Sequence, residues 1–348
     1  MNSRPTLATV AELAGVSRQT VSNVISNPHL VAPITLERVR AVIAQVDYRP
    51  NTAARRLRTQ RSFVVGARMT TDFDGISGYV LDHFLHAVTS AAQRVDLHIL
   101  LYVADDAEAE IQIWDQLLAE GGVDGLVLAH THADDPRTRW LSERKVPFVA
   151  FGRPWNNNGT HPGDHAWVDV DGCAGVRLAT ERLLELGHRR IAFLGWPEGS
   201  GVGDDRLGGY LAALAASDQD VEPLVRRCDG TVREATEVAT ELLADPELTA
   251  IVTVSDSLAL GASTAVRECA PRQVAIVGFD DTPVARALDL SSVAQPVDIV
   301  ADHCIDFLRA QIDAANARFS QAKPVNPADR QILIQPRLVE RASSRSPN

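Results

Sequence analysis

The sequence predicts a small all-α head followed by a large α/β body built as two lobes. Residues 6–46 hold three short stretches whose apolar side chains recur at helical spacing, which predicts helices. After residue 62, apolar strand-like runs alternate with helical stretches, the pattern of parallel sheets covered by helices. This second part has roughly 285 residues, more than a single hydrophobic core usually supports, so we expect two similar lobes.

Capping and turn residues delimit the first predicted helix. Thr6 is a suitable N-cap, because its hydroxyl can accept a hydrogen bond from a free N–H of the first turn. Val10, Leu13 and Ala14 follow at i, i+3, i+4 spacing. Gly15 then provides the left-handed residue that favours a helix end. We therefore expect a short amphipathic helix between Thr6 and Gly15.

The second predicted helix, which Ser17 can cap, has one apolar and one polar face. Its apolar stripe consists of Val21, Val24 and Ile25. The opposite face carries Gln19, Ser22, Asn23 and Ser26, with Arg18 at the N-terminal edge. A third helix has its apolar positions at Val39, Val42, Ile43 and Val46. This order predicts a three-helix helix-turn-helix domain that presents its second helix to DNA.

The charge distribution supports a nucleic-acid contact by the head. Residues 1–61 contain nine arginines against three acidic side chains, a net charge of +6, whereas the whole chain carries −11. The remaining residues therefore carry −17. Basic charge concentrated on one small domain is typical of phosphate binding, since counterion release supplies much of the affinity for DNA.

Residues 51–61 form a predicted hinge between head and body. Asn51 can cap a helix of about two turns that ends near Thr59. A helix this short is marginal alone in water, so we expect it to need DNA or a partner helix to persist. Its apolar Leu57 is flanked by Arg55 and Arg58. The hinge is therefore a candidate switch between an ordered and a disordered state.

The predicted elements of the body repeat one pattern. The strand-like runs are 63–65, 97–103, 125–129, 148–151, 167–170, 191–195, 250–254 and 274–279. Helices in the second half are expected near 172–187, 204–216, 232–244 and 257–269. Ligands of such sheets bind outside the carboxyl ends of the strands, and two facing lobes create a cleft there. Ligand contacts are therefore expected at strand ends.

Further features concern the setting of the chain. The first residues, 1–5, lack the apolar segment of a signal peptide, and no run is long enough to span a bilayer, which predicts a cytoplasmic protein without a membrane partner. The four cysteines lie far apart without a Cys-x-x-Cys pair, which argues against a disulfide framework or a zinc ribbon. Residues 342–348 are expected to form a disordered tail.

Several motifs in this order resemble the lactose-repressor (LacI/GalR) family. In the head these are Thr9-Val10-Ala11, Ala14-Gly15-Val16-Ser17, Thr20-Val21-Ser22, Tyr48-Arg49-Pro50-Asn51 and Ala54-Arg55-Arg56-Leu57. In the body they are Leu186-Gly187-His188-Arg189-Arg190-Ile191-Ala192-Phe193, Ser255-Asp256-Ser257-Leu258-Ala259-Leu260-Gly261 and Val277-Gly278-Phe279-Asp280-Asp281.

The resemblance implies a homodimeric transcription factor, most simply a repressor of carbohydrate uptake or breakdown genes that a small sugar-like effector controls. It assigns residues 1–50 to the helix-turn-helix domain and 51–61 to the hinge helix and linker. Residues 62–341 then form the effector-binding and dimerisation domain, similar to a type I periplasmic sugar-binding protein. Whether the effector releases DNA or promotes its binding stays open.

Side-chain chemistry on the second helix indicates contacts with a double-stranded DNA operator. Arg18 can donate two hydrogen bonds to guanine and Gln19 can pair with adenine, each worth roughly 1–3 kcal/mol of discrimination. The family reads bases at similar positions but often has arginine where this chain has Asn23, so we expect a shifted preference at one operator position. By resemblance, two hinge helices lie in the minor groove of an inverted repeat, where Leu57 opens a central CG step.

Other polar residues of the head are candidate phosphate contacts. These are Thr20, Ser22 and Asn27; for Ser22 and Asn27 the alternative is simple capping or solvation. For Leu57 the alternative is an anchor of the domain linker. The full set of candidate DNA-binding residues is Thr6, Ser17, Arg18, Gln19, Thr20, Ser22, Asn23, Asn27, Asn51, Arg55, Leu57 and Arg58.

Strand ends of the second half supply effector candidates. By resemblance, Asp280 binds ligand hydroxyls, and Arg206, expected to open a helix over 207–214, grips the effector. Ser255 replaces an asparagine that is common in the family. Asp256 either contacts the effector or caps the helix that follows.

Aromatic and basic residues complete the candidate effector site. Trp196, which follows a strand, can stack on a pyranose ring, and Phe73 and Trp155 are further possibilities. Arg153 is another candidate, although Gly152 stands where some relatives carry an acidic ligand residue. The set fits a hydroxyl-rich molecule of sugar size; a purine remains an alternative, and a phosphorylated sugar would need more positive charge.

Other functional classes lack their motifs. The loop 199–203 does not match Gly-x-Gly-x-x-Gly, because Asp204 and Arg206 occupy the position of the third glycine in the two possible registers. His130, His132, Asp134 and Asp135 lie on a connecting loop without a second ligand group at helical spacing, which argues against a metal. A periplasmic binding protein would need a signal sequence in place of the basic head. The sequence therefore predicts no enzyme, metal or cofactor.

Overall fold

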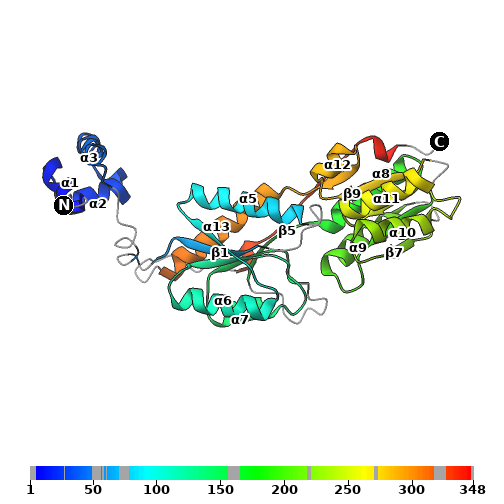
Figure 1. Ribbon diagram of the computed structural model, residues 1–348, viewed down its shortest axis with the longest axis horizontal. Helices are drawn as coiled ribbons and strands as arrows, with labels where there is room; N and C mark the ends of the chain where they lie inside the picture. The colour runs from blue at the N-terminus through cyan, green and yellow to red at the C-terminus, as the bar shows by residue number, and fades with distance from the viewer. Residues whose placement is uncertain are drawn as a thin grey trace. The chain divides into compact units, whose positions relative to one another are not determined.

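The computed structural model describes residues 5–26, 28–48, 56, 59, 61–69, 78–155, 165–217, 221–269, 273–316 and 327–345. The chain separates into two compact units, Met1–Ser62 and Phe63–Asn348, called here the head and the body. Their helices and some of their strands are labelled in Figure 1. The head is helical and the body contains two sheets flanked by helices, so the predicted fold class is confirmed.

The head packs short helices around a core of small apolar side chains. Its elements are α1 (Leu7–Ala14), α2 (Arg18–Ser26), the 3-10 helix η1 (Pro28–Leu30) and α3 (Pro33–Gln45). At the start of α1, Thr6 Oγ1 accepts the N–H of Thr9 at 3.3 Å, and Thr9 Oγ1 accepts the N–H of Thr6 at 3.2 Å. The helix ends at Gly15, whose φ is 63°. Both predicted ends of this helix are confirmed.

The apolar stripes of the head differ in part from the prediction. Val10, Val21 and Val39 are fully buried, but Leu13 and Ile25 are 58% and 37% exposed. The side of α1 that faces the core also carries buried alanines, at positions 11 and 14, and this leaves position 13 at the edge of the contact. Small domains bury only a narrow stripe of each helix.

The N-lobe of the body is a parallel sheet with helices on both faces. Its strand order is β11 (Gln331–Ile334), β5 (Ala166–Val170), β4 (Phe148–Phe151), β3 (Gly125–Leu128), β1 (Val64–Arg68) and β2 (His98–Tyr102). One face is covered by α5 (Tyr79–Arg94) and α13 (Val297–Asn316), and the other by α6 (Ala107–Ala119) and α7 (Pro136–Glu143) (Figure 1). Each face buries its own apolar cluster, one around Phe84 and one around Trp114.

The C-lobe repeats this design. Its strand order is β12 (Arg337–Val339), β10 (Ser291–Ala294), β9 (Ala275–Phe279), β8 (Ala250–Thr253), β6 (Ile191–Gly195) and β7 (Leu224–Arg227), with β12 antiparallel to β10. Its helices are α8 (Gly172–Glu185), α9 (Gly201–Ala216), α10 (Val232–Leu242), α11 (Asp256–Cys269) and the short α12 (Pro283–Ala287). Strand for strand the two orders correspond, which confirms the predicted repetition.

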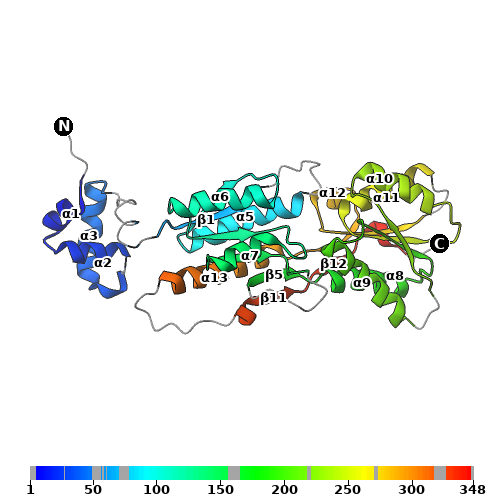
Figure 2. The same ribbon diagram turned by 90° about the horizontal axis from the view of Figure 1, so that it is seen from below.

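The chain passes between the lobes more than once. Asp171 joins β5 to α8, residues 295–296 join β10 to α13, and residues 335–336 join β11 to β12 (Figure 2). The N–H of Asp171 donates to the carbonyl of Ile334 at 2.9 Å, and Gln335 Nε2 donates to Asp171 Oδ2 at 3.0 Å. The first and last of these segments are therefore hydrogen-bonded to each other.

The chain beyond β12 is ordered further than predicted. The prediction of disorder for 342–348 is wrong for its first part, because Ala342–Ser344 form the 3-10 helix η3 against the C-lobe sheet. Ser343 Oγ donates to the carbonyl of Ile276 at 2.6 Å, and Ser344 is buried. Serine hydroxyls pair here with backbone groups of the sheet, which a reading of the composition alone misses.

Candidate functional site

The helix α2 presents its polar residues to solvent. Arg18 and Gln19 are exposed, whereas Val21 on the other side of the helix is buried. Ser17 Oγ accepts the N–H of Thr20 at 3.0 Å, which confirms Ser17 as the N-cap. The face that the sequence assigns to DNA is therefore accessible and is held on a capped helix.

Asn23 interacts directly with Gln19. Gln19 Nε2 donates to Asn23 Oδ1 at 3.0 Å, one helical turn further on. One proton of Gln19 Nε2 is used in this bond, which leaves its second Nε2 proton and its Oε1. These are the donor and the acceptor that complement the major-groove edge of adenine.

Part of the predicted site lies outside the described residues. These candidates are Asn27, Asn51, Arg55, Leu57 and Arg58 for DNA and Phe73 for the effector. The remaining DNA candidates lie on α1 and α2 or at their caps. Their contacts with DNA stay a prediction.

Arg206 is the central cation of the C-lobe site. Its side chain is buried on α9, and its Nη1 donates to the carbonyl of Val254 at 2.6 Å. The guanidinium carbon lies 3.7 Å from the ring centre of Phe279 and 5.6 Å from that of Trp196. Its Nε is buried and has no hydrogen-bond acceptor among the residues that the structure describes. A buried donor of this kind is usually satisfied by water or by a ligand.

The start of α9 differs from the prediction. The helix begins at Gly201, three residues before the predicted start near residue 204 and five residues before Arg206, which was expected to open it. Ser200 Oγ accepts the N–H of Gly203 at 3.1 Å, so the glycine-rich segment is capped and helical. Arg206 consequently lies on the second turn of the helix, and its side chain is buried there.

Asp280 follows β9 and faces Arg206. Asp280 Oδ1 lies 3.8 Å from Arg206 Nη2 and accepts a hydrogen bond from Gln295 Nε2 at 2.7 Å. Burial raises the pKa of Asp280 to about 7, although the charge of Arg206 lowers it. Its φ is 109°, a conformation that L residues rarely adopt. Gln295 was not a candidate from the sequence, because the Ser-Ser-Val-Ala segment before it does not predict a strand.

Asp256 holds the loop that carries Asp280. Asp256 Oδ2 accepts the N–H of Thr282 at 2.7 Å, and Oδ1 accepts the hydroxyl of Ser292 at 2.6 Å. Burial raises the pKa of Asp256 to about 6, against the effect of these hydrogen bonds. Ser255, also buried, stands directly before α11, where the N–H of Leu258 donates to its Oγ at 3.5 Å.

Trp196 and Arg153 come from the ends of β6 and β4. The Trp196 ring is partly exposed beside Arg206, so its role as a stacking platform stays a prediction. The guanidinium of Arg153 already has carboxylate partners: its Nε donates to Asp169 and its Nη2 to Asp205, both at 2.9 Å. Its predicted contact with the effector stays untested.

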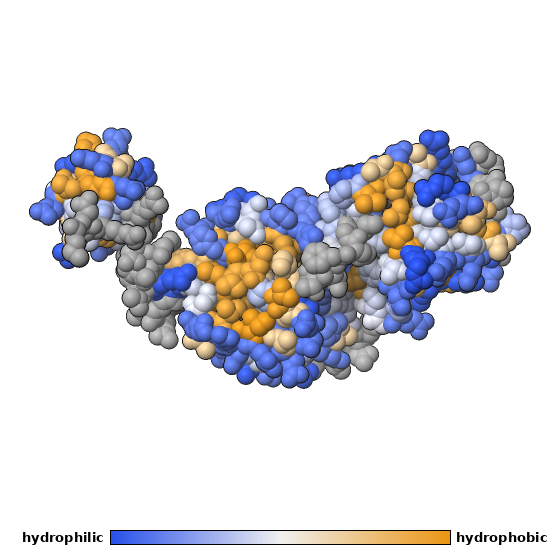
Figure 3. Space-filling model, viewed as in Figure 1, coloured by the Kyte–Doolittle hydropathy of each residue, from blue (hydrophilic) through white to orange (hydrophobic). Residues whose placement is uncertain are grey.

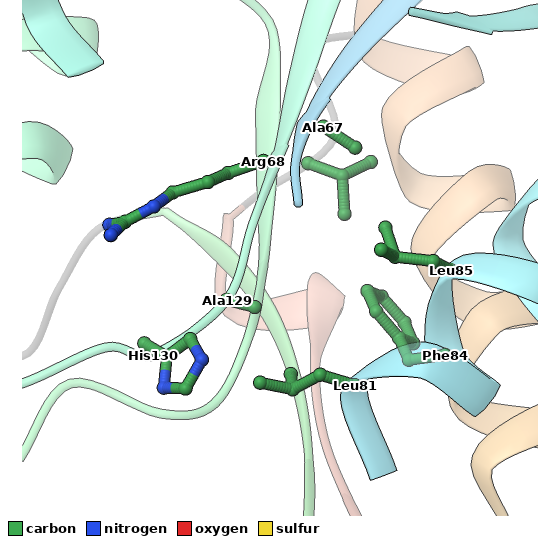
Figure 4. Close-up of a pocket in the computed structure, with 8 residues that line it drawn as sticks. Ala67, Arg68, Leu81, Phe84, Leu85, Ala129 and His130 are labelled. Carbon is green, nitrogen blue, oxygen red and sulfur yellow. The ribbon is translucent and has the colours of Figure 1, made fainter. Parts of the chain in front are cut away.

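The N-lobe offers an apolar pocket at the ends of β1 and β3. It is lined by Ala67, Leu81, Phe84, Leu85, Val127 and Ala129, with Arg68 and His130 at its border. Figure 4 shows Arg68 directed away from Phe84, toward the other face of the sheet, where its Nη1 lies 3.4 Å from Glu110. The ends of β1 and β3 therefore present mostly apolar surface, whereas the ends of β4 and β5 carry the charged Arg153 and Asp169.

A buried ion network supports this border of the N-lobe pocket. Arg137 Nη1 donates to Glu110 at 2.8 Å and its Nη2 to Asp135 at 2.7 Å. The same Nη2 donates to the carbonyls of Ala129 and His130, at 3.1 and 2.8 Å. The network fixes the loop after β3. The sequence analysis missed it, because Arg137 and Glu110 lie far apart along the chain.

A helix-turn-helix head joined to two α/β lobes, one of which gathers charged and aromatic side chains at its strand ends, defines a DNA-binding regulator that senses a small ligand. Residues 6–51 match the family model of bacterial regulatory proteins of the lacI family. Residues 180–344 match that of the periplasmic binding protein-like domain. The chain belongs to the LacI family of transcriptional regulators.

Relatives cover most of the chain. It is 35% identical over 307 residues to the HTH-type transcriptional regulator CelR of Thermobifida fusca, covering 85% of this chain and 88% of CelR. It is 32% identical over 294 residues to the HTH-type transcriptional regulator RafR of Escherichia coli, covering 83% and 85%. A solved structure of a transcriptional regulator CelR–cellobiose complex is 31% identical, with a TM-score of 0.67 over 98% of this chain and 100% of that one.

Proposed function

We propose that this regulator is a cytoplasmic, homodimeric repressor of carbohydrate uptake or breakdown genes, and that an uncharged sugar bound between its lobes controls its affinity for an operator. It acts without catalysis, metal or cofactor. Among the described residues, no helix has the length and apolar character needed to cross a membrane. The operator is expected to be an inverted repeat with a central CG step.

The observation that carries the proposal is the pairing of Arg206 with Asp280. A buried guanidinium with an unused Nε proton lies 3.8 Å from a carboxylate, so a donor and an acceptor face the same space. Vicinal hydroxyls of a sugar can accept from the first and donate to the second. Trp196 beside this pair offers a surface for the apolar face of a pyranose.

Charge argues for an uncharged ligand. Around the candidate effector site, two cations, Arg153 and Arg206, are outnumbered by four carboxylates, which are Asp169, Asp205, Asp256 and Asp280. A phosphate or carboxylate group on the ligand would be repelled by this excess of negative charge. Cellobiose, named in the complex of the relative, is therefore the first sugar to test.

A second copy of the chain is proposed to cover the outer edge of β2. Within the described sheet, this strand has a partner on one side only, β1. Leu101 and Val103 at this edge are 47% and 43% exposed. Figure 3 shows an apolar patch on the N-lobe between α5 and α6. Such surfaces favour association over solvation.

The experiment that tests the proposal is selection of DNA fragments from the source genome by purified protein, repeated with a panel of uncharged sugars, sugar phosphates and purines. We expect an inverted repeat near carbohydrate genes, with retention altered by one uncharged sugar. Retention altered only by a sugar phosphate or a purine would refute the ligand class. No retained sequence under any condition would refute DNA reading by the head.

A further inference from the structure

Arg153 connects the two lobes of the body. It follows β4 in the N-lobe, and its Nε donates to Asp169 Oδ2 on β5 of the same lobe at 2.9 Å. Its Nη2 donates to Asp205 Oδ2 on α9 of the C-lobe, also at 2.9 Å. The side chains of Arg153, Asp169 and Asp205 are 21%, 11% and 18% exposed. Solvent therefore screens this ion pair less than it screens a surface pair.

Neighbouring contacts fix both ends of this connection. On the N-lobe side, Thr131 Oγ1 donates to the carbonyl of Arg153 at 3.0 Å. On the C-lobe side, the N–H of Cys173 donates to Asp205 Oδ2 at 2.9 Å. The loop of Arg153 also brings Trp155 onto the start of α9, so closely that a Cβ at Gly201 would overlap the indole.

The connection adjoins the candidate effector site. Asp205 precedes Arg206 on α9, so a displacement that separates Arg153 from Asp205 also moves Arg206 relative to the N-lobe. An arginine that served mainly as an effector contact would keep its donors for the ligand. Arg153 instead uses Nε and Nη2 for protein carboxylates, one in each lobe.

We propose that Arg153 is an ionic clamp that stabilises the lobe arrangement enclosing the effector, and that it affects effector binding through this arrangement and not by touching the ligand. The predicted effect on effector binding rests on the proposed function. The ion pair between the lobes itself needs no ligand. A ligand that contacts both lobes favours the arrangement in which both are within reach. The clamp and the effector therefore cooperate, and removal of the clamp weakens effector binding.

The test compares Arg153→Gln, Asp205→Asn and the double variant in the full-length protein. Dyes introduced at the exposed positions of Glu108 on α6 and Glu237 on α10 report the distance between the lobes by energy transfer. We expect both single variants to widen the distance distribution to the same extent, and the double variant to widen it no further. Cellobiose affinity, measured by calorimetry, should fall about tenfold in each, a usual size for coupling between sites.

Matched variants separate the clamp from other roles. Arg177→Gln removes a comparable pair with Glu181 at 2.7 Å, but within α8 alone, and should change neither distance nor affinity. Arg153→Lys keeps the charge but lacks the fork that spans two carboxylates, so it should not restore the distance. Unchanged lobe distances in Arg153→Gln and Asp205→Asn would overturn the clamp even if no sugar binds. Lower cellobiose affinity in Arg153→Gln alone would make Arg153 a direct effector contact.

Discussion

The head and the body place their polar residues in opposite settings. In the head, Arg18 and Gln19 project from an exposed helix face over a core of valines, alanines and Tyr48. In the body, Arg206, Asp256 and Asp280 are withdrawn from solvent at strand and helix ends and bonded to one another or to neighbours. Residues of the first kind can be exchanged with little effect on folding, whereas each residue of the second kind also supports the fold.

This contrast orders the expected effects of mutation. A change at the head surface should alter operator recognition and leave the body intact. A change at the buried site of the body should alter effector binding and stability together.

Asp280→Asn should have the largest effect, on effector binding. The change removes the carboxylate that faces Arg206 but retains the side-chain shape and tolerates the φ of 109° better than alanine would. We expect a loss of about 2–5 kcal/mol in effector affinity, since one partner of a buried pair is lost. Calorimetry with the sugar at pH 8 measures it, and operator binding without sugar should be retained.

Asp306→Asn is the control for this prediction. Asp306 is exposed on α13, and its replacement should leave sugar affinity unchanged. Full sugar affinity in Asp280→Asn would exclude Asp280 from the effector site. It would also contradict the expectation that changes at this buried site of the body alter effector binding.

Leu57→Ala should have the next largest effect, on operator binding. If Leu57 is the apolar wedge of the hinge helix, losing its side chain should weaken binding by about 1.5–3 kcal/mol, the value of burying a leucine. Fluorescence anisotropy with operator DNA measures this loss. Effector affinity should stay at the wild-type value; an equal loss of both activities would indicate misfolding.

Asn23→Arg should redirect recognition at one operator position. The change removes the acceptor that holds Gln19 Nε2 at 3.0 Å and introduces a donor suited to guanine. We expect a change in base preference worth about 1–2 kcal/mol at one base pair of each half-site. Selection from a randomised operator library reports it. An unchanged preference at every position would mean that this pair does not face the bases.

The last expected effect is on the pH dependence of stability. Burial raises the folded-state pKa of Asp280 to about 7, against the lowering effect of Arg206. The folded chain therefore retains a proton that the unfolded chain has lost, so this group contributes stability at low pH, and the contribution declines as pH rises from about 4 toward 7. The Tm of the wild type minus that of Asp280→Asn should be more positive at pH 5 than at pH 8. A difference that is constant with pH would contradict the raised pKa.

Local signals in the sequence predicted the local structure. Thr6, Gly15 and Ser17 act through neighbours within a few residues, so their capping roles were readable from the sequence and are confirmed. Continuous apolar runs predicted the buried strands. For most helices of the C-lobe, the predicted ends lie close to the observed ends. The strand β10, Ser-Ser-Val-Ala, was missed because its small residues become a strand only between β9 and β12.

Partners distant in the chain were beyond prediction. Arg153 and Arg206 were recognised as candidates, but Asp205 as the partner of Arg153 is set by the approach of α9 to the end of β4. The buried Glu110–Arg137 pair depends in the same way on how α6 and α7 lie against one face of the sheet. Pattern and family resemblance identify which side chains carry the chemistry, and tertiary packing decides which of them meet.

The placement of β11 and β12 has a consequence for how the chain is made. Residues 331–334 form one edge strand of the N-lobe sheet, and residues 337–339 form one edge strand of the C-lobe sheet. A nascent chain leaves the ribosome N-terminus first, so neither sheet acquires its last strand until this short segment has emerged. The lobes then mature together at the end of translation, and the pair becomes competent to sense a ligand in one step.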